Sequence, residues 1–158
     1  MSDEQFTRSY QMHKNSVYAV IFHYVRNDAD ASELLQETFM RLYTNEKPFD
    51  SDEHEKAWLL RVAINLSKNH LRRMKFNAYS EIDENIPAPI QEDYSDLLRA
   101  VHELPEKYRI PIHLFYYEDY SVREIAGLLG ILEATVKTRL NRARSMLKKK
   151  LGKEYAVA

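Results

Sequence analysis

Apolar and polar positions recur along this chain with the period of an α-helix, and the pattern predicts seven helices. Three are expected at about 4–26, 30–43 and 53–75, and four more at about 95–103, 105–117, 121–129 and 133–151. Glycine is scarce, with 3 residues among 158, and aromatic residues make up 11% of the chain. Because this composition is typical of helical globular proteins, we expect an all-α fold.

Polar residues and proline mark the helix boundaries in the first half. Asn27 and Asp28 interrupt the first helix, and Asp30 with Glu33 predicts an N-terminal cap for the second. Residues 44–52, which include a proline, are expected to form a loop before the third helix.

Proline, serine and glycine mark the boundaries in the second half. Pro105 suits the first turn of a helix, and Pro111 predicts a kink or a break inside that helix. Ser121 with Glu124 predicts a capping box, and Gly130 can adopt the left-handed conformation that ends a helix. A short capped helix, a glycine turn and a further helix predict a helix-turn-helix over residues 121–145.

The second helix of this motif has two different sides when its residues are placed at about 100° per position. The side expected to pack consists of Val136, Leu140, Ala143, Met146 and Leu147. The outer side consists of Ala134, Thr138, Asn141, Arg142 and Ser145, flanked by Lys137 and Arg139. Small and amide side chains can approach base edges while Lys and Arg hold phosphates, so we expect DNA binding. The alternative is a solvated basic helix end, which the helix dipole also favours.

The third helix carries a second basic face. Its polar stripe consists of Arg61, Asn65, Lys68 and Arg72. The side expected to lie opposite consists of Trp58, Leu59, Val62 and Leu66, with Asn69 and Arg73. Solvated helix faces usually mix acids and bases, but no acid occurs between residues 56 and 77. Although a solvated face is the alternative, two basic helix faces predict that the chain touches DNA at two places.

The second helix has an outer side of another kind. Leu34, Leu35, Phe39 and Leu42 are expected to face inward. The side left outside consists of Gln36, Glu37, Met40 and Arg41. An exposed methionine beside charged residues indicates a protein contact, although a surface methionine without any partner is the alternative.

Residues 77–94 differ in composition from the helices on either side. This segment carries five acids and no base, together with Pro87 and Pro89. We therefore expect a flexible acidic linker between two small helical domains at residues 1–76 and 95–158. The second domain carries twelve bases against eight acids, so a polyanion is expected to meet it rather than the linker.

The chain lacks the residues that several classes of function require. The chain has no cysteine, which excludes disulfides and thiolate metal sites and fits a reducing cytoplasm. The six histidines are dispersed, no glycine-rich phosphate loop is present, and no apolar run reaches membrane-spanning length. We expect a cytoplasmic protein that is not an enzyme and has no metal, cofactor or small-molecule substrate.

Four segments, in this order, resemble those of the sigma-70 family of RNA polymerase sigma factors. Residues 30–41 (DASELLQETFMR) resemble the polymerase-binding helix, and residues 57–73 (AWLLRVAINLSKNHLRR) resemble the helix that reads the −10 element. Leu104–Arg109 and the helix-turn-helix, with its TVKTRLNRAR end, resemble region 4, which reads the −35 element. With only a short linker between them, these segments are similar to the ECF (extracytoplasmic-function) group.

The resemblance implies that residues 1–76 bind core RNA polymerase and recognise and melt the −10 element, while residues 95–158 recognise the −35 element. The contact with the clamp helices of the largest polymerase subunit would be made by Leu35, Gln36, Glu37, Met40 and Arg41. The −10 contacts would be made by Arg61, Asn65, Lys68, Asn69 and Arg72, and a flipped base would lie in the loop 46–56. The −35 contacts would be made by Ala134, Lys137, Thr138, Arg139, Asn141 and Arg142. The implied partners are core polymerase, including its flap, promoter DNA, and an anti-sigma factor that can sequester the protein at the membrane.

Two features depart from the family pattern. Leu132 stands where Ser or Pro is common, so the recognition helix lacks a good N-cap, at a cost of about 1 kcal/mol. The loop 46–56 is rich in acids, which leaves open which of its residues touches a base. From the residues alone, a free-standing helix-turn-helix regulator is the alternative, although the first domain gives no clear signal of a ligand pocket.

Overall fold

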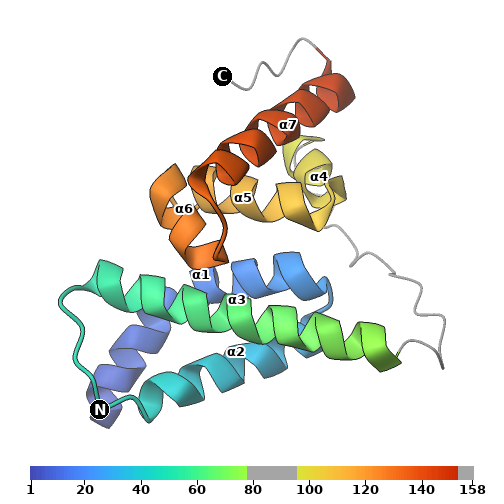
Figure 1. The fold of residues 1–158 in the computed structure, drawn as a ribbon. Coiled ribbons are helices and arrows are strands. Elements are labelled where there is room, and N and C mark those ends of the chain that lie inside the picture. The colour runs from blue at the N-terminus through green and yellow to red at the C-terminus, as the bar shows by residue number, and fades with distance from the viewer. Residues whose placement is uncertain (78–95, 153–158) are drawn as a thin grey trace. The chain divides into compact units, whose positions relative to one another are not determined.

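The computed structural model describes residues 1–77 and 96–152, which form seven α-helices and no strand (Figure 1). The chain divides into two compact units, residues 1–88 and 89–158. The prediction of an all-α fold with two small helical domains is therefore confirmed. Residues 78–94 of the predicted linker lie outside the described residues. None of the described helices combines the length and the apolar character that crossing a membrane requires.

Three mutually packed helices form the first unit: α1 (Asp3–Val25), α2 (Asp28–Tyr43) and α3 (Asp52–Asn77). In Figure 1 the long α3, drawn in green, runs alongside the other two. The core between them includes the fully buried side chains of Val17, Ile21, Leu42, Leu59, Leu60 and Ile64. These residues come from the apolar stripes of all three helices, so the unit has a hydrophobic core of its own.

Only two residues connect α1 to α2. Arg26 adopts the left-handed conformation (φ 61°) and ends α1 through its N–H, which donates to the Phe22 carbonyl at 2.8 Å. The side-chain oxygen of Asn27 then accepts the backbone N–H of Asp30 at 2.8 Å. The predicted cap at Asp30 was therefore wrong, and α2 begins at Asp28. Asparagine caps a helix as well as aspartate does, and here it also interrupts the preceding helix.

Four helices form the second unit: α4 (Asp96–Glu103), α5 (Glu106–Tyr116), α6 (Val122–Leu129) and α7 (Glu133–Leu151). Helix α7 contacts the other three, and its apolar side completes their core. The buried side chains include Leu104, Ile112, Leu114, Ile125, Leu140 and Leu147.

The predicted boundaries of the helix-turn-helix are confirmed. The Ser121 hydroxyl accepts the Glu124 N–H at 3.1 Å, and the Glu124 carboxylate accepts the Ser121 N–H at 3.0 Å. Gly130 ends α6 in the left-handed conformation, with φ 67°. Leu132 occupies the N-cap position of α7 without a side-chain hydrogen bond, and its side chain is 75% exposed. The structure therefore confirms the prediction that α7 lacks a side-chain N-cap.

Proline behaves differently from the prediction at two positions. Of the kink or break predicted at Pro111, the break was wrong, because helix α5 continues through this residue, while the kink stays a prediction. Pro111 lacks the N–H that would bond to the carbonyl of Lys107. Because Lys107 is exposed in the first turn, water can satisfy that carbonyl. Pro105 lies just before the first residue of α5 rather than in its first turn.

Candidate nucleic-acid interface

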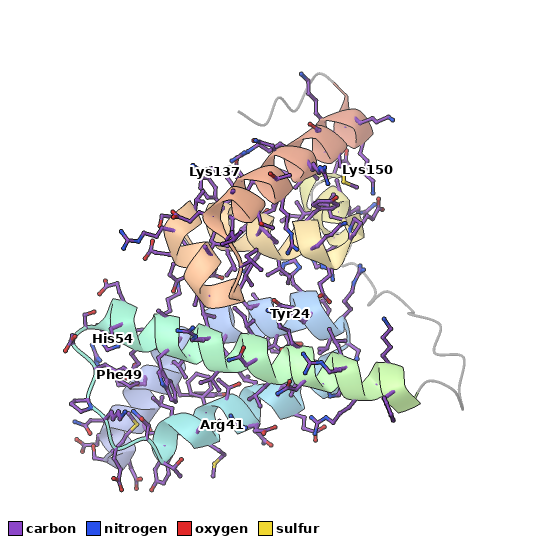
Figure 2. The ribbon with its side chains drawn as sticks, viewed as in Figure 1. Tyr24, Arg41, Phe49, His54, Lys137 and Lys150 are labelled. Atoms are coloured by element: carbon purple, nitrogen blue, oxygen red, sulfur yellow. The ribbon has the colours of Figure 1, made fainter. Side chains whose placement is uncertain are left out.

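Helix α7 presents a polar and basic outer side. Ala134, Lys137, Thr138, Asn141 and Arg142 are exposed, and Arg139 is half-buried. The opposite side is buried and consists of Val136, Leu140, Ala143 and Leu147. Figure 2 labels Lys137 in the first half of the helix and Lys150 near its end. The division predicted from helical angle is confirmed, except that Met146 is half-buried.

Two aromatic residues at the end of α5 hold an arginine of α7. The Nε–H of Arg144 donates to the Tyr116 hydroxyl at 2.7 Å, and its Nη1–H donates to the side-chain oxygen of Asn141 at 3.0 Å. The guanidinium also lies 5.5 Å from the ring centre of Phe115 and 5.6 Å from that of Tyr116. Asn141, which lies on the outer side of α7, is thereby held in one orientation.

Two further basic residues of α7 have partners in the same unit. A hydrogen bond from Arg142 lowers the pKa of the Tyr108 hydroxyl below its ordinary value. The Nζ of Lys150 lies 2.7 Å from the carboxylate of Glu103, and this hydrogen bond lowers the pKa of that carboxyl. The basic end of α7 is therefore partly neutralised where it meets α4.

The stripe on α3 is exposed for most of its length. Arg61, Asn65 and Arg72 are exposed, and Lys68 is half-buried. The core side of the helix includes the buried residues Leu59, Leu60, Ala63, Ile64, Leu66 and Ser67. Among the described residues, Arg61, Asn65 and Arg72 have no hydrogen-bond or ion-pair partner. The stripe is therefore a largely exposed polar surface beside the core, and three of its residues are without a partner in the described part of the chain.

Two residues expected to lie opposite the stripe are exposed instead. Asn69 follows Asn65 by four positions, so it lies on the same side and widens the stripe. Arg73 belongs to the stretch 72–76 of α3, which is exposed on every side because the other helices of the unit do not cover it. The prediction that both residues share the packed side was wrong.

The loop between α2 and α3 borders a cavity of about 780 Å³, which the start of α1 closes on another side. The Phe49 ring lies edge-on to Trp58 and His54, with ring centres 5.5 and 5.3 Å away. Figure 2 labels Phe49 and His54 in this part of the first unit. Trp58 is half-buried and precedes Arg61 by three positions, so it lies beside the stripe and not opposite to it. The prediction for Trp58 was wrong because an aromatic residue of the loop, not the helix core, covers its ring.

Two acids of the loop region are paired with residues of α1. Arg8 donates to both carboxylate oxygens of Asp52 at 3.2 and 3.1 Å and holds the pKa of that carboxyl below its ordinary value. The Nε2 of His13 lies 3.1 Å from the Oε1 of Glu55, and both side chains are buried. Burial lowers the pKa of His13, against the opposing effect of Glu55. These pairs anchor the start of α3 to α1 and leave the other acids of the loop exposed.

The outer side of α2 adjoins an apolar groove. As predicted, Gln36, Glu37, Met40 and Arg41 are exposed, whereas Leu34, Phe39 and Leu42 are buried and Leu35 is half-buried. The groove, of about 440 Å³, is lined by Phe6, Tyr10, Gln36, Phe39 and Met40. The sequence pattern missed the part played by α1, because Phe6 and Tyr10 belong to its apolar stripe and resemble ordinary core residues.

Comparisons with known proteins identify the family. A model of Sigma-70 region 2 matches residues 9–76, and a model of Sigma-70 region 4 matches residues 94–147. The ECF RNA polymerase sigma factor SigW of Bacillus subtilis is 30% identical, over 94% of this chain and 89% of its own length. The RNA polymerase sigma factor SigV of the same organism is 33% identical, over 90% of this chain and 88% of its own length. The chain belongs to the ECF sigma factors.

The fold of this sigma factor is also found in solved structures. The sigma factor RpoE of Bartonella quintana, solved in complex with the anti-sigma factor NepR, matches with a TM-score of 0.80. That match covers 96% of this chain and 99% of the other at 22% identity, so it shows the fold alone. Sigma factors are not enzymes in the catalytic sense.

The structure of this sigma factor brings its predicted residues onto three separate surfaces: the stripe of α3, the outer side of α7 and the outer side of α2. Tyr108 and Tyr116 were missed by sequence reasoning because they lie on α5 and contact α7 across some 30 positions of sequence. An apolar residue pattern cannot distinguish a tyrosine that packs from one whose hydroxyl holds an arginine.

Proposed function

We propose that this sigma factor binds core RNA polymerase and directs it to promoters through separate contacts with the −10 and −35 elements. The observation that carries the proposal is that each unit presents one exposed basic helix side, on α3 and on α7. Each of these sides lies within a segment that matches the family regions. Residues 1–76 and 95–158 are the proposed domains, and residues 77–94 the linker between them.

The outer side of α7 is proposed to enter the −35 major groove. Ala134 and Thr138 are short enough to let the helix backbone approach, and Asn141 and Arg142 extend toward base edges. Lys137 and Arg139 flank this side and are suited to phosphate contacts. Exposed Lys148 and Lys149 lie further along and are proposed to contact phosphate alone.

The stripe on α3 is proposed to follow a strand of the −10 element. Arg61, Lys68 and Arg72 can hold phosphates, whereas Asn65 and Asn69 can bond to bases or sugars. The cavity beside the loop is proposed to take a base flipped out of the duplex. Phe49 supplies an aromatic ring there, and exposed carboxylates can accept hydrogen bonds from the amino group of a base.

The outer side of α2 is proposed to bind the clamp helices of the largest polymerase subunit. Leu35, Gln36, Glu37, Met40 and Arg41 combine apolar and polar groups on one surface, beside the groove. Met40 is 59% exposed, and burying it against a partner would remove its apolar surface from water. The second unit is proposed to contact the polymerase flap.

Regulation by an anti-sigma factor is part of the proposal. It is supported by the solved relative of similar fold that is bound to such a factor. We propose a cytoplasmic protein that acts by binding, without catalysis of its own and without a small-molecule substrate.

Run-off transcription tests the proposed function. Core polymerase with this chain should initiate at discrete sites on promoters of the host genome, and neither component alone should do so. The double variant Gln36→Ala/Glu37→Ala should lose activity while keeping its helicity. Tight and specific binding to promoter duplex without polymerase would instead favour a free-standing regulator.

A further inference from the structure

The outer side of α7 contains one amide whose orientation is fixed by its neighbours. Asn141 is exposed and lies one helical turn before Arg144, whose Nη1–H donates to the Asn141 side-chain oxygen at 3.0 Å. Exposed amides usually rotate freely, but this one is tied to a residue that is itself held from α5.

The chemistry of the pair leaves only one orientation for the amide. A guanidinium has five N–H donors and no acceptor, so only the oxygen of Asn141 can face Arg144. The amide nitrogen of Asn141 therefore points away from Arg144 and carries two N–H donors. In this state Asn141 offers both N–H donors to a partner, while one of the two lone pairs of its oxygen already accepts from the charged Arg144.

Tyr116 keeps Arg144 in the position that this arrangement requires. Its hydroxyl accepts from the Nε–H of Arg144 at 2.7 Å, on a different edge of the guanidinium from the bond to Asn141. The rings of Phe115 and Tyr116 lie against the guanidinium at 5.5 and 5.6 Å, which limits its rotation. The chain of contacts therefore runs from the end of α5 through Arg144 to the amide.

We propose that Tyr116 and Arg144 are positioning residues that make Asn141 a hydrogen-bond donor in the −35 major groove. This inference rests on the proposed function of α7. Guanine presents two acceptors, O6 and N7, and thymine presents O4, whereas the amide pairs with adenine through both its oxygen and its nitrogen. Guanine and thymine can be bound through the N–H donors alone, whereas the adenine pairing also needs the oxygen to accept, in competition with Arg144. The base favoured at Asn141 is therefore guanine first and thymine second, ahead of adenine.

The test is a selection of randomised −35 elements by run-off transcription with core polymerase and the full-length chain. The Asn141→Ala variant first identifies the base pair that Asn141 contacts. That pair is the position of the −35 element at which the variant loses the base preference of the wild type. Tyr116→Phe then removes only the hydroxyl that holds Arg144. Tyr117→Phe is the matched control, because it removes a neighbouring hydroxyl while keeping the ring that stacks on His113.

The wild-type protein should select guanine or thymine at that pair. Tyr116→Phe should raise the use of adenine relative to guanine about three- to tenfold, the usual range for one lost hydrogen bond. Its other base preferences, its helicity and its melting temperature should match those of Tyr117→Phe. Arg144→Lys should shift the same position in the same direction, because lysine keeps the charge but cannot hold both partners in one plane.

Three outcomes would overturn the inference. One is a wild-type preference for adenine at the pair, and another is a Tyr116→Phe profile identical to that of Tyr117→Phe. The third is an Asn141→Ala variant with every preference intact. Each leaves the proposed function standing as long as the wild type initiates at specific promoters. A wild type that selects no −35 sequence at all refutes the proposed function of α7, and the inference fails with it.

Discussion

The two basic helices of this sigma factor differ in how their polar side chains are held. On α3, Arg61, Asn65 and Arg72 have no partner among the described residues. On α7, Arg142 bonds to Tyr108, and Arg144 is fixed between Tyr116 and Asn141. Three polar side chains of α3 are therefore not held by other residues of the described chain, whereas two arginines of α7 are held by residues of their own unit.

This difference fits the two proposed tasks. Base edges in a duplex groove lie in fixed positions, so a reader gains selectivity from side chains whose geometry is already set. A strand that is being opened changes its shape, and long side chains without partners can follow it. The structure thus suggests selectivity at α7 and adaptability at α3.

The largest expected effect concerns the separate cores of the two units. Leu140→Ala should destabilise the second unit by about 2–5 kcal/mol, because it leaves a cavity among fully buried side chains. The only tryptophan, Trp58, belongs to the first unit, so its fluorescence reports on that unit alone. In thermal unfolding followed by circular dichroism, the transition of the second unit should move to a lower temperature. The transition of the first unit, followed by Trp58 fluorescence, should stay at the same temperature.

The matched variant in the first unit is Ile64→Ala, which is expected to move the Trp58 transition instead. If Leu140→Ala shifted both transitions equally, the two units would unfold as one, and the claim that each is stabilised by its own core would be wrong.

A smaller effect is expected from Arg142 on α7. Arg142→Ala should weaken use of the preferred −35 sequence by about 1–3 kcal/mol and relax the preference at one position. Lys149→Ala should weaken all sequences alike, and by less, since an exposed lysine holds phosphate without reading bases. Selection among randomised −35 elements measures both. An unchanged preference in Arg142→Ala would remove this residue from the set of base contacts.

The stripe on α3 should show a different pattern. Asn65→Ala and Lys68→Ala should each reduce open-complex formation on duplex promoters roughly tenfold, or about 1.4 kcal/mol, while polymerase binding and helicity stay normal. The defect should be relieved on a template already mismatched across the bubble. Permanganate reactivity of bubble thymines measures opening on both templates.

Arg72 and Arg73 provide a graded control for the stripe, because they are adjacent and of one type. Arg72 follows Lys68 by four positions and lies in line with the stripe, whereas Arg73 follows Asn69 and lies at its edge. Arg72→Ala should therefore impair opening more than Arg73→Ala. Full opening by Asn65→Ala and Lys68→Ala would show that the stripe is merely a solvated face.

The smallest effect expected is a pH dependence in the first unit. Burial lowers the pKa of His13 in the folded state, so the unfolded chain takes up a proton first as the pH falls. Stability of this unit should therefore decrease as the pH falls below about 6.5, the ordinary pKa of histidine, until the folded state is protonated too. His13→Gln should flatten this dependence, measured by Trp58 fluorescence in urea.

The sequence predicted the elements and the outer sides of the helices well. The capping box at Ser121 and the left-handed Gly130 depend on residues close together in sequence, so local chemistry was enough to find them. The exposed side of α2 followed from helical spacing alone.

What the sequence could not predict depends on contacts between distant residues. Trp58 lies beside the stripe because Phe49 covers it, and the groove on α2 is completed by Phe6 and Tyr10 of α1. The apolar periodicity of a single helix does not predict such contacts between elements. The error at Pro111 had another cause, since the penalty for proline depends on whether water reaches the carbonyl left without a partner.

Leu132 has a practical consequence for protein engineering. Its side chain is 75% exposed at the start of α7 and contributes no cap, so the position is free to change. Leu132→Ser would supply the missing acceptor and add about 1 kcal/mol of stability, which in a domain of this size raises the melting temperature by about 4–8 °C. The same change removes a leucine from the surface, and it offers a more soluble starting material for crystallising the second unit on DNA.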